Sequence, residues 1–325
     1  FVAKNGSPLV IGVSATATYV ASDPLAIADQ TDRFIFLEDG DCGKITNNDI
    51  ALIDKHGQKV DRPIVQLSID PQDNSKGPYE HYMLKEIHEQ PAAISRTLEG
   101  KLADDHISAG AIGTDAMKLL AQVQNVHIIA CGTSYNAGLV AAYWLERHAG
   151  VTAKVEIASE YRYRSPYVPE RSMFVSISQS GETADTLAAL KLANELPYEL
   201  RLSICNVPQS SIVRESDFAL LTTAGAEIGV ASTKAFTTQL CALLLLTGLM
   251  TRVSKGNELQ IVEELKVLPN LVEQILGLDQ DILKIAQAIA DKENALFLGR
   301  GEYYPIAIEG ALKLKEISYI HAEAY

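Results

Sequence analysis

Short apolar runs separated by turn residues dominate residues 1–62. Their length and their β-branched and aromatic side chains are typical of strands. The runs are PLVIGV (8–13), TYVA (18–21), RFIFLE (33–38) and IALID (50–54). Asp39-Gly40 and His56-Gly57 mark tight connections between them. Because no long helical period interrupts this pattern, the sequence predicts a β-rich piece here.

A polar stretch with proline and glycine, residues 70–78 (DPQDNSKGP), follows this piece and predicts a linker. Residues 82–98 then have helical character. Pro91 lies inside them, and proline lacks the N–H that an interior helical turn uses. We therefore expect the helix to kink or restart at Pro91.

From Asn125 onward, strand-length apolar runs alternate with helix-length segments. The predicted strands are 126–130, 155–159, 173–178, 201–207 and 218–222, and the predicted helices are 135–148, 184–196 and one that follows residues 229–234 and runs through Met250. This alternation indicates a parallel sheet covered by helices on both faces. Within the last helix, Leu240–Met250 is apolar but shorter than the roughly 18 residues of a membrane span, so a buried helix is predicted.

The final third of the chain repeats the strand–turn–helix pattern that begins at Asn125. After helical segments between residues 258 and 290, the strand-like residues 295–301 run directly into a helix over 304–318. Gly132 and Gly301 align at an offset of 169 positions, and residues 158–161 (ASEY) echo residues 322–325 (AEAY). A repeat of this size indicates duplicated domains. The second copy contains only one strand–helix–strand unit, which predicts that the chain is truncated at Tyr325.

Composition and charge narrow the function classes. Hydrophobic residues make up 47% of the 325 residues and charged residues 21%, which excludes disorder and a small disulfide-stapled scaffold. The net charge of −13 and the scattered basic residues argue against nucleic acid as a partner. The four cysteines lie far apart without a CxxC pair, which indicates neither a disulfide framework nor a zinc ribbon and suits the cytoplasm.

Three turns share one design, in which a strand ends, small hydroxyl-bearing residues follow and a helix begins. The turns are Cys131-Gly132-Thr133-Ser134, Ser178-Gln179-Ser180-Gly181-Glu182-Thr183 and Val230-Ala231-Ser232-Thr233. The free N–H groups and the dipole of a helix N-terminus favour an anion. No GxxxxGK[ST] or GxGxxG motif is present, so a monophosphate on a small polyol fits better than a nucleotide. Ordinary helix capping by serine and threonine is the alternative.

Ionisable groups suited to proton transfer are sparser. Glu309, Lys313 and Glu316 are spaced to lie on one face of the helix 304–318. They form either a solvated face or a carboxylate placed to move a proton beside a carbonyl or imine carbon. His81 and His88 lie seven positions apart but lack a third ligand, so no metal site is predicted.

Four motifs in this order resemble the glutamine–fructose-6-phosphate aminotransferase (glucosamine-6-phosphate synthase) family. They are ACGTSYN, SQSGETADT, EIGVASTKAFTTQ and EGALKLKEISYIHAEAY, and the likeness covers essentially the whole chain. The resemblance implies an α/β fold: a flavodoxin-like αβα sugar-isomerase (SIS) domain, duplicated with the second copy incomplete, preceded by a β-rich remnant of an N-terminal-nucleophile glutaminase domain. On this basis we expect the remnant and linker at 1–69, the first SIS domain at 70–255 and the second at 256–325.

The resemblance also implies residue roles and partners. Ser134, Ser178, Gln179, Ser180 and Thr183 would hold the 6-phosphate; Cys131, Gly132, Thr133, Val230 and Ser232 would line the sugar chain. Glu316 would be the base that shifts a proton between C1 and C2, with Lys313 as its cationic neighbour. The implied reaction converts fructose 6-phosphate and glutamine to glucosamine 6-phosphate and glutamate in a homodimer, with neither metal nor organic cofactor.

The chain also departs from the family pattern. It lacks the amino-terminal cysteine nucleophile, the GELKHGP histidine motif and the tail lysine that forms the Schiff base. We therefore expect that this polypeptide alone neither hydrolyses glutamine nor completes the synthesis. Two alternatives remain: a non-catalytic sugar-phosphate-binding regulator, and a simple phosphosugar isomerase or deglycase. The β-rich start weighs against both, and the acidic charge weighs against the regulator.

Overall fold

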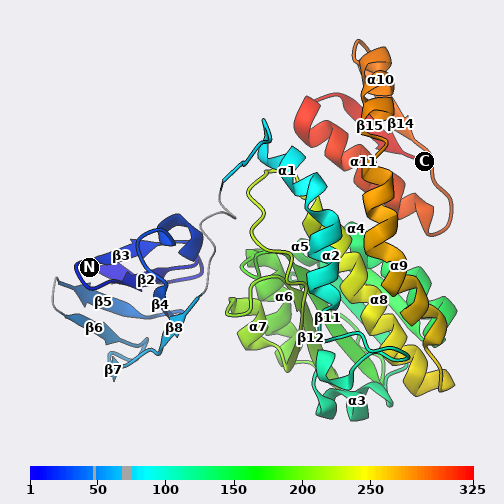
Figure 1. Cartoon of the computed structure of the whole chain (residues 1–325). Coiled ribbons are helices and arrows are strands. Elements are labelled where there is room, and N and C mark those ends of the chain that lie inside the picture. Colours follow the sequence, from blue (N-terminus) through cyan, green and yellow to red (C-terminus); the bar gives the residue numbers. More distant parts are fainter. Residues whose placement is uncertain (47–48, 68–74) are drawn as a thin grey trace. The chain divides into compact units, whose positions relative to one another are not determined.

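The computed structural model describes residues 1–46, 49–67 and 75–325, which form two compact units, Phe1–Gly77 and Pro78–Tyr325 (Figure 1). Most of the predicted linker, and the expected boundary between residues 69 and 70, lie outside the described residues.

The first unit is β-rich, as the apolar runs predict, and consists of two antiparallel four-stranded sheets. One sheet has the order β1 (Val2–Ala3), β5 (Cys42–Ile45), β6 (Ile50–Ile53), β7 (Lys59–Val60); the other has the order β3 (Thr18–Ala21), β2 (Val10–Val13), β4 (Arg33–Phe36), β8 (Ile64–Gln66), with the short 3₁₀ helix η1 (Pro24–Ile27) after β3. Their core is formed by Ile11, Ile35, Leu37 and Leu52. Alternating inward apolar side chains thus build this unit.

The second unit is built on a parallel five-stranded sheet, which confirms the predicted sheet type. Its order is β10 (Thr152–Ile157), β9 (Asn125–Ala130), β11 (Ser172–Ser178), β12 (Leu200–Cys205), β13 (Phe218–Leu221). Read along the chain this is the 2-1-3-4-5 order of the flavodoxin-like doubly wound sheet. In such a sheet the direction of winding reverses between the first and third strands, here β9 and β11, and ligands bind at that point.

Helices cover both faces of this sheet. The helices of the second unit are α1 (Tyr82–His88), α2 (Gln90–Leu98), η3 (Ala109–Ala111), α3 (Thr114–Leu120), α4 (Gly132–Trp144), the π turn η4 (Leu145–Ala149), α5 (Ala158–Tyr161), α6 (Ala184–Asn194), α7 (Ser211–Glu215), α8 (Lys234–Lys255), α9 (Leu259–Leu276), α10 (Asp279–Ile289) and α11 (Tyr303–Ser318). Residues of α2 to α9 form the core on the two faces of the sheet, whereas α11 packs on α4, β14 and β15. Neighbouring strand residues alternate between the faces. Ile128 belongs to a core that also contains residues of α2, α3, α4, α8 and α9, whereas Ile129 belongs to a second core with residues of α5, α6 and α7.

Two sequence expectations about helices are met. The helix over 82–98 is divided: α1 ends at His88, and α2 restarts with Pro91 in its first turn, where a missing N–H is harmless. Lys234–Lys255 is long and apolar enough to cross a membrane by composition, with a mean hydropathy of 1.4. However, 67% of its most apolar stretch is buried, and it packs against α2, α4 and α9, so it acts as a core helix.

The C-terminal strands repeat the geometry of the first two strands of the sheet. β14 (Asn294–Phe297) pairs in parallel with β15 (His321–Ala324). Asn294 pairs with His321, and Asn125 pairs with Thr152, so both partners are shifted by 169 positions. The echo of 158–161 in 322–325 is wrong as a structural match, because residues 158–161 form α5 whereas 321–324 form a strand equivalent to β10.

Candidate functional site

A cavity of about 270 Å³ lies where the predicted site residues converge, at the carboxyl ends of β9 and β11. Its lining residues are Cys131, Thr133, Ser134, Gln179, Ser180, Thr183, Val230, Ser232, Lys313 and Glu316. They come from the three turns and from α11, segments that are far apart in the sequence. Of the expected site residues, only Gly132 and Ser178 do not line it.

The first turn links β9 to α4 within a few residues. Gly132 has a φ of +55°, a left-handed conformation that favours glycine. Thr133 and Ser134 follow in the first turn of the helix and face the cavity. Among the described residues, no side chain accepts a hydrogen bond from the N–H groups of this first turn. The N-terminus of α4 therefore keeps its positive end available to a ligand.

The second turn links β11 to α6, and its glycine is required by space as well as by backbone geometry. Gly181 has a φ of +68°, and a Cβ placed there would lie 2.0 Å from the Ser210 hydroxyl oxygen. The buried Ser178 Oγ accepts a hydrogen bond from the Gly181 N–H at 3.0 Å and lies 2.9 Å from Thr183 Oγ1. Ser178 therefore shapes the turn, whereas Ser180 and Thr183 present hydroxyl groups to the cavity.

The start of α6 resembles the start of α4. In the part of the chain that the structure describes, no side chain caps the first-turn N–H groups after Thr183. Two helix N-termini with unoccupied donors thus open into one cavity that is also lined by Ser134, Ser180 and Thr183. Converging N–H groups, hydroxyls and helix dipoles favour an anion such as a phosphate.

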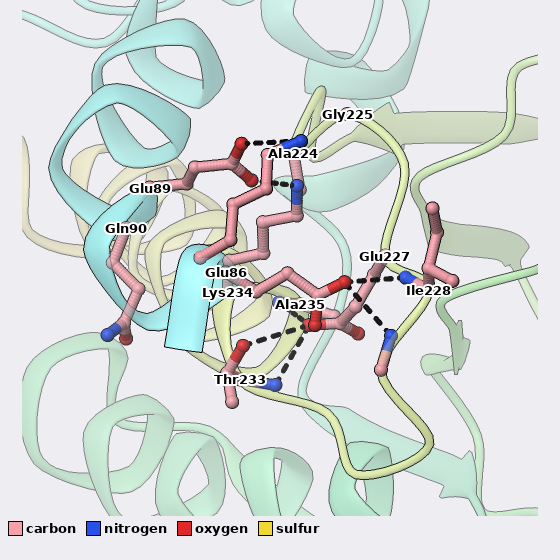
Figure 2. Close-up of polar contacts among 12 residues, drawn as sticks. Glu86, Glu89, Gln90, Ala224, Gly225, Glu227, Ile228, Thr233, Lys234 and Ala235 are labelled. Atoms are coloured by element: carbon pink, nitrogen blue, oxygen red, sulfur yellow. Dashed lines mark hydrogen bonds and ion pairs between the residues drawn. The ribbon is translucent and has the colours of Figure 1, made fainter. Parts of the chain in front are cut away.

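The third turn departs from the design predicted for all three turns, because the alternative, helix capping, applies here. At the start of α8, Glu227 Oε1 accepts hydrogen bonds from the N–H groups of Thr233 (2.8 Å) and Ala235 (3.1 Å), as Figure 2 shows. A carboxylate already occupies these donors and offsets the helix dipole. Val230, fully exposed, and Ser232 thus line the cavity beside a helix that offers it no open N-terminus.

Helix α11 lines the cavity with a charged face that packs on α4 and is not simply solvated. Lys313 Nζ donates to Thr133 Oγ1 at 3.1 Å and to Glu316 Oε2 at 2.7 Å. The buried Glu309 accepts hydrogen bonds from Thr133 Oγ1 (2.9 Å) and Asn136 Nδ2 (2.7 Å). This arrangement holds Lys313 and Glu316 at the cavity wall.

Sequence reasoning placed Glu309 on this helix face but gave it no role, and it did not consider Asn136. The only available signal was the spacing of Glu309, Lys313 and Glu316, because the contact joins positions 173 apart in the chain. Glu309 belongs to the site as the group that fixes α11 against the first turn of α4.

No metal centre accompanies this arrangement in the described residues, where no group of three or more His, Cys, Asp or Glu side chains could hold an ion. His88, one of the two histidines considered for a metal, stacks on Tyr79 at 5.3 Å. Cys131 is a free, half-buried thiol at the cavity wall.

Comparison with known proteins was made by family model, sequence and structure. The model described as SIS domain matches residues 119–248. The chain is 54% identical to glutamine–fructose-6-phosphate aminotransferase [isomerizing] of Shewanella oneidensis over 327 aligned positions, covering 100% of this chain and 54% of that protein. It is 55% identical to the Pseudomonas putida enzyme of the same name, covering 99% and 54%. The chain therefore spans about half the length of the curated relatives it matches.

Solved structures agree with the sequence matches. The C-terminal domain of glucosamine-fructose-6-phosphate aminotransferase from Francisella tularensis superposes with a TM-score of 0.75 at 55% identity, covering 77% of this chain and 71% of that one. A putative phosphosugar isomerase from Silicibacter pomeroyi DSS-3 superposes with a TM-score of 0.63 at 26% identity, covering 75% and 71%. The residues that match the SIS domain model, 119–248, lie within the second unit.

Proposed function

Because the chain belongs to the glutamine–fructose-6-phosphate aminotransferase family, we propose that its second unit binds fructose 6-phosphate in the cavity at the ends of β9 and β11. One observation carries this proposal: two uncapped helix N-termini open into a cavity lined by hydroxyl groups, beside a Lys313–Glu316 pair. A phosphate monoester supplies the anion that the helix ends favour. A small polyol supplies hydroxyl groups for the remaining polar wall.

In this proposal the ligand lies across the cavity with its phosphate at the starts of α4 and α6. Ser134, Gln179, Ser180 and Thr183 hold the phosphate, and Ser178 fixes their turn. The sugar chain extends past Cys131, Gly132 and Thr133 toward Val230 and Ser232. Different turns thereby bind the phosphate end and the sugar end of the ligand. This fixes the orientation of the ligand for the reaction.

The reaction we propose for the whole enzyme is amination of fructose 6-phosphate at C2 followed by isomerisation to glucosamine 6-phosphate. Ammonia from glutamine replaces the C2 oxygen, which leaves as water, and forms an imine. Glu316 then takes a proton from C1 and returns it at C2, which moves the double bond and gives the aldose. Lys313, 2.7 Å from the Glu316 carboxylate, orients it and balances its charge.

The other regions extend the same proposal. The two β-sheets of the first unit are the remnant of a glutaminase domain, which supplies ammonia from glutamine, and the enzyme acts in the cytoplasm as a homodimer. The segment β14–α11–β15 begins a second SIS domain. Its repeated strand register and its exposed apolar residues Leu296 and Leu298 support this assignment, because further elements of such a domain would cover them.

A phosphosugar isomerase without amidotransferase activity is the second candidate, and the superposition on the Silicibacter pomeroyi protein favours it. Both candidates bind a phosphosugar and use a carboxylate to move a proton. They differ in whether glutamine is consumed. Formation of glucosamine 6-phosphate from fructose 6-phosphate and glutamine by the whole enzyme supports the first; interconversion of ketose and aldose phosphates without glutamine supports the second.

The binding proposal is tested by calorimetric titration of the chain with fructose 6-phosphate, fructose and inorganic phosphate. We expect fructose 6-phosphate to bind, fructose to bind at least about 100-fold more weakly, and Ser180→Ala to weaken only the phosphate-bearing ligands, by about fivefold. Equal affinity for fructose and fructose 6-phosphate would refute the phosphate site.

The role of Glu316 is tested by Glu316→Gln, which keeps the size of the side chain and removes its basicity. We expect fructose 6-phosphate to bind within about threefold of the wild-type affinity, while glucosamine 6-phosphate formation by the whole enzyme falls about 100-fold or more. Full activity of the glutamine variant would assign the proton transfer to another group.

A further inference from the structure

A buried carboxylate on α1 holds the residues that directly precede the third turn (230–233). Glu86 is 2% exposed, and its Oε1 accepts hydrogen bonds from the N–H groups of Ile228 (2.6 Å) and Gly229 (3.0 Å). Figure 2 shows the bond with Ile228. These two residues directly precede Val230, which lines the cavity. The contact spans more than 140 positions of the chain, so it is a tertiary anchor and not part of a local turn.

Because Glu86 is buried, its carboxylate stabilises the one loop conformation that supplies hydrogen bonds to it. An ionised carboxylate loses its hydration when it is buried, so it must be compensated by hydrogen bonds. Within the described residues Glu86 Oε2 has no partner, and both compensating donors come from the loop. Any loop conformation that withdraws these N–H groups would leave the buried carboxylate uncompensated.

Gly229 shows how closely the loop and the carboxylate fit. A Cβ at this position would lie 2.5 Å from Glu86 Oε2 and 3.5 Å from the backbone of Met83. Atoms do not approach this closely without a shift, so a side chain at this position would displace the Glu86 carboxylate from the loop. Helix α1 and the loop are therefore matched in shape as well as in hydrogen bonding.

Resting on the proposed function, we propose that Glu86 is a positioning residue for the sugar-chain end of the site. By fixing Ile228 and Gly229, it sets the positions of Val230 and Ser232 opposite the phosphate-binding turns. Among the described residues Glu86 makes no hydrogen bond with those turns, and the turn before α6 is held by Ser178 at the end of β11. Its loss should therefore impair recognition of the sugar and leave recognition of the phosphate intact.

A buried carboxylate elsewhere in the same unit provides a matched control. Glu258 is 5% exposed and pairs with Arg252 at 2.9 Å and with the Ile107 N–H at 3.4 Å. None of these residues lines the cavity. Glu258→Ala thus removes a comparable buried anchor without touching the proposed sugar contacts.

The test measures the affinities for fructose 6-phosphate and for inorganic phosphate of the 325-residue chain and its variants by calorimetry, with thermal unfolding recorded for each. We expect Glu86→Ala to bind fructose 6-phosphate about tenfold more weakly and inorganic phosphate unchanged. Glu86→Gln, which retains the accepting oxygen, should stay within about threefold of wild type. Glu258→Ala should lower the unfolding temperature and leave both affinities unchanged.

A double-mutant cycle tests whether the effect arises from the contact between Glu86 and Gly229. Gly229→Ala should weaken fructose 6-phosphate binding about tenfold in the wild-type background and about twofold or less in the Glu86→Ala background, because the carboxylate that its methyl group meets has been removed. Should Glu86→Ala fail to fold, Glu86→Gln and Gly229→Ala carry the test.

Unchanged fructose 6-phosphate affinity in Glu86→Ala or Gly229→Ala would overturn the positioning role, as would equal losses for fructose 6-phosphate and inorganic phosphate. Absence of fructose 6-phosphate binding by the wild-type chain is a different result, since it refutes the proposed function itself.

Discussion

The turns before α4 and α6 and the turn before α8 look alike in sequence but differ in what they offer a ligand. All three carry small hydroxyl-bearing residues at the start of a helix. At α4 and α6 no side chain caps the first-turn N–H groups in the described residues, whereas at α8 Glu227 accepts hydrogen bonds from two N–H groups. The capacity to bind an anion therefore depends on which donors remain free and not on local composition alone.

The largest expected effect comes from adding a negative charge to each kind of turn. A carboxylate about 4 Å from a phosphate is opposed by about 4 kcal/mol at an effective dielectric constant near 20. We expect Ser180→Asp to weaken fructose 6-phosphate binding about 100-fold or more, and Ser232→Asp, at the sugar end, to weaken it about tenfold or less. If calorimetric titration showed equal losses of fructose 6-phosphate affinity in the two variants, the distinction between the turns would be wrong.

Removing the capping carboxylate of α8 is the change with the second-largest expected effect, and it should lower the stability of the fold. Glu227→Ala leaves the N–H groups of Thr233 and Ala235 without their acceptor, so we expect the free energy of unfolding to fall by about 1–2 kcal/mol. Glu227→Gln retains an accepting oxygen and should lose less. Chemical denaturation measures both variants, and an alanine variant as stable as wild type would show that the cap is unimportant.

The strands that lead into the turns also differ in their ionisable side chains. This difference predicts a smaller effect, a pH dependence of the free energy of unfolding. His127 on β9 is buried between Glu156 (2.7 Å) and the Tyr198 hydroxyl (2.8 Å), whereas β13 (FALL) carries no ionisable side chain. Burial lowers the pKa of His127, and its hydrogen bond with Glu156 opposes this only in part. The folded state thus binds this proton less readily than the unfolded state does.

It follows that unfolding free energy should decrease as the pH falls below the ordinary histidine pKa of about 6.5. His127→Gln lacks this titration, so its stability should change less between pH 7 and pH 5. Denaturation at a series of pH values measures the difference, and identical pH profiles for the two proteins would exclude His127 as its source.

Local sequence signals were sufficient for the elements and for most of the cavity wall. Strand-to-helix turns rich in serine and threonine placed Ser134, Ser180 and Thr183 at one edge of the parallel sheet, because carboxyl ends of parallel strands meet there. The restart at Pro91 and the burial of Leu240–Met250 followed from backbone chemistry and run length.

The remaining features depend on contacts that no local pattern records. Glu309 with Asn136, and Glu86 with Ile228, join segments more than 140 positions apart. Glu227 lies only six residues before Thr233, but its cap depends on how the intervening loop folds back. Residues 158–161 and 322–325 were paired by composition, although one segment is helical and the other extended.

The most direct test is a crystal structure of the chain with fructose 6-phosphate bound. We predict the phosphate within hydrogen-bonding distance of the Ser134, Ser180 and Thr183 hydroxyls, between the starts of α4 and α6, with the sugar extending toward Val230 and Ser232. A phosphate bound instead at the start of α8, with Glu227 displaced from Thr233 and Ala235, would contradict the account.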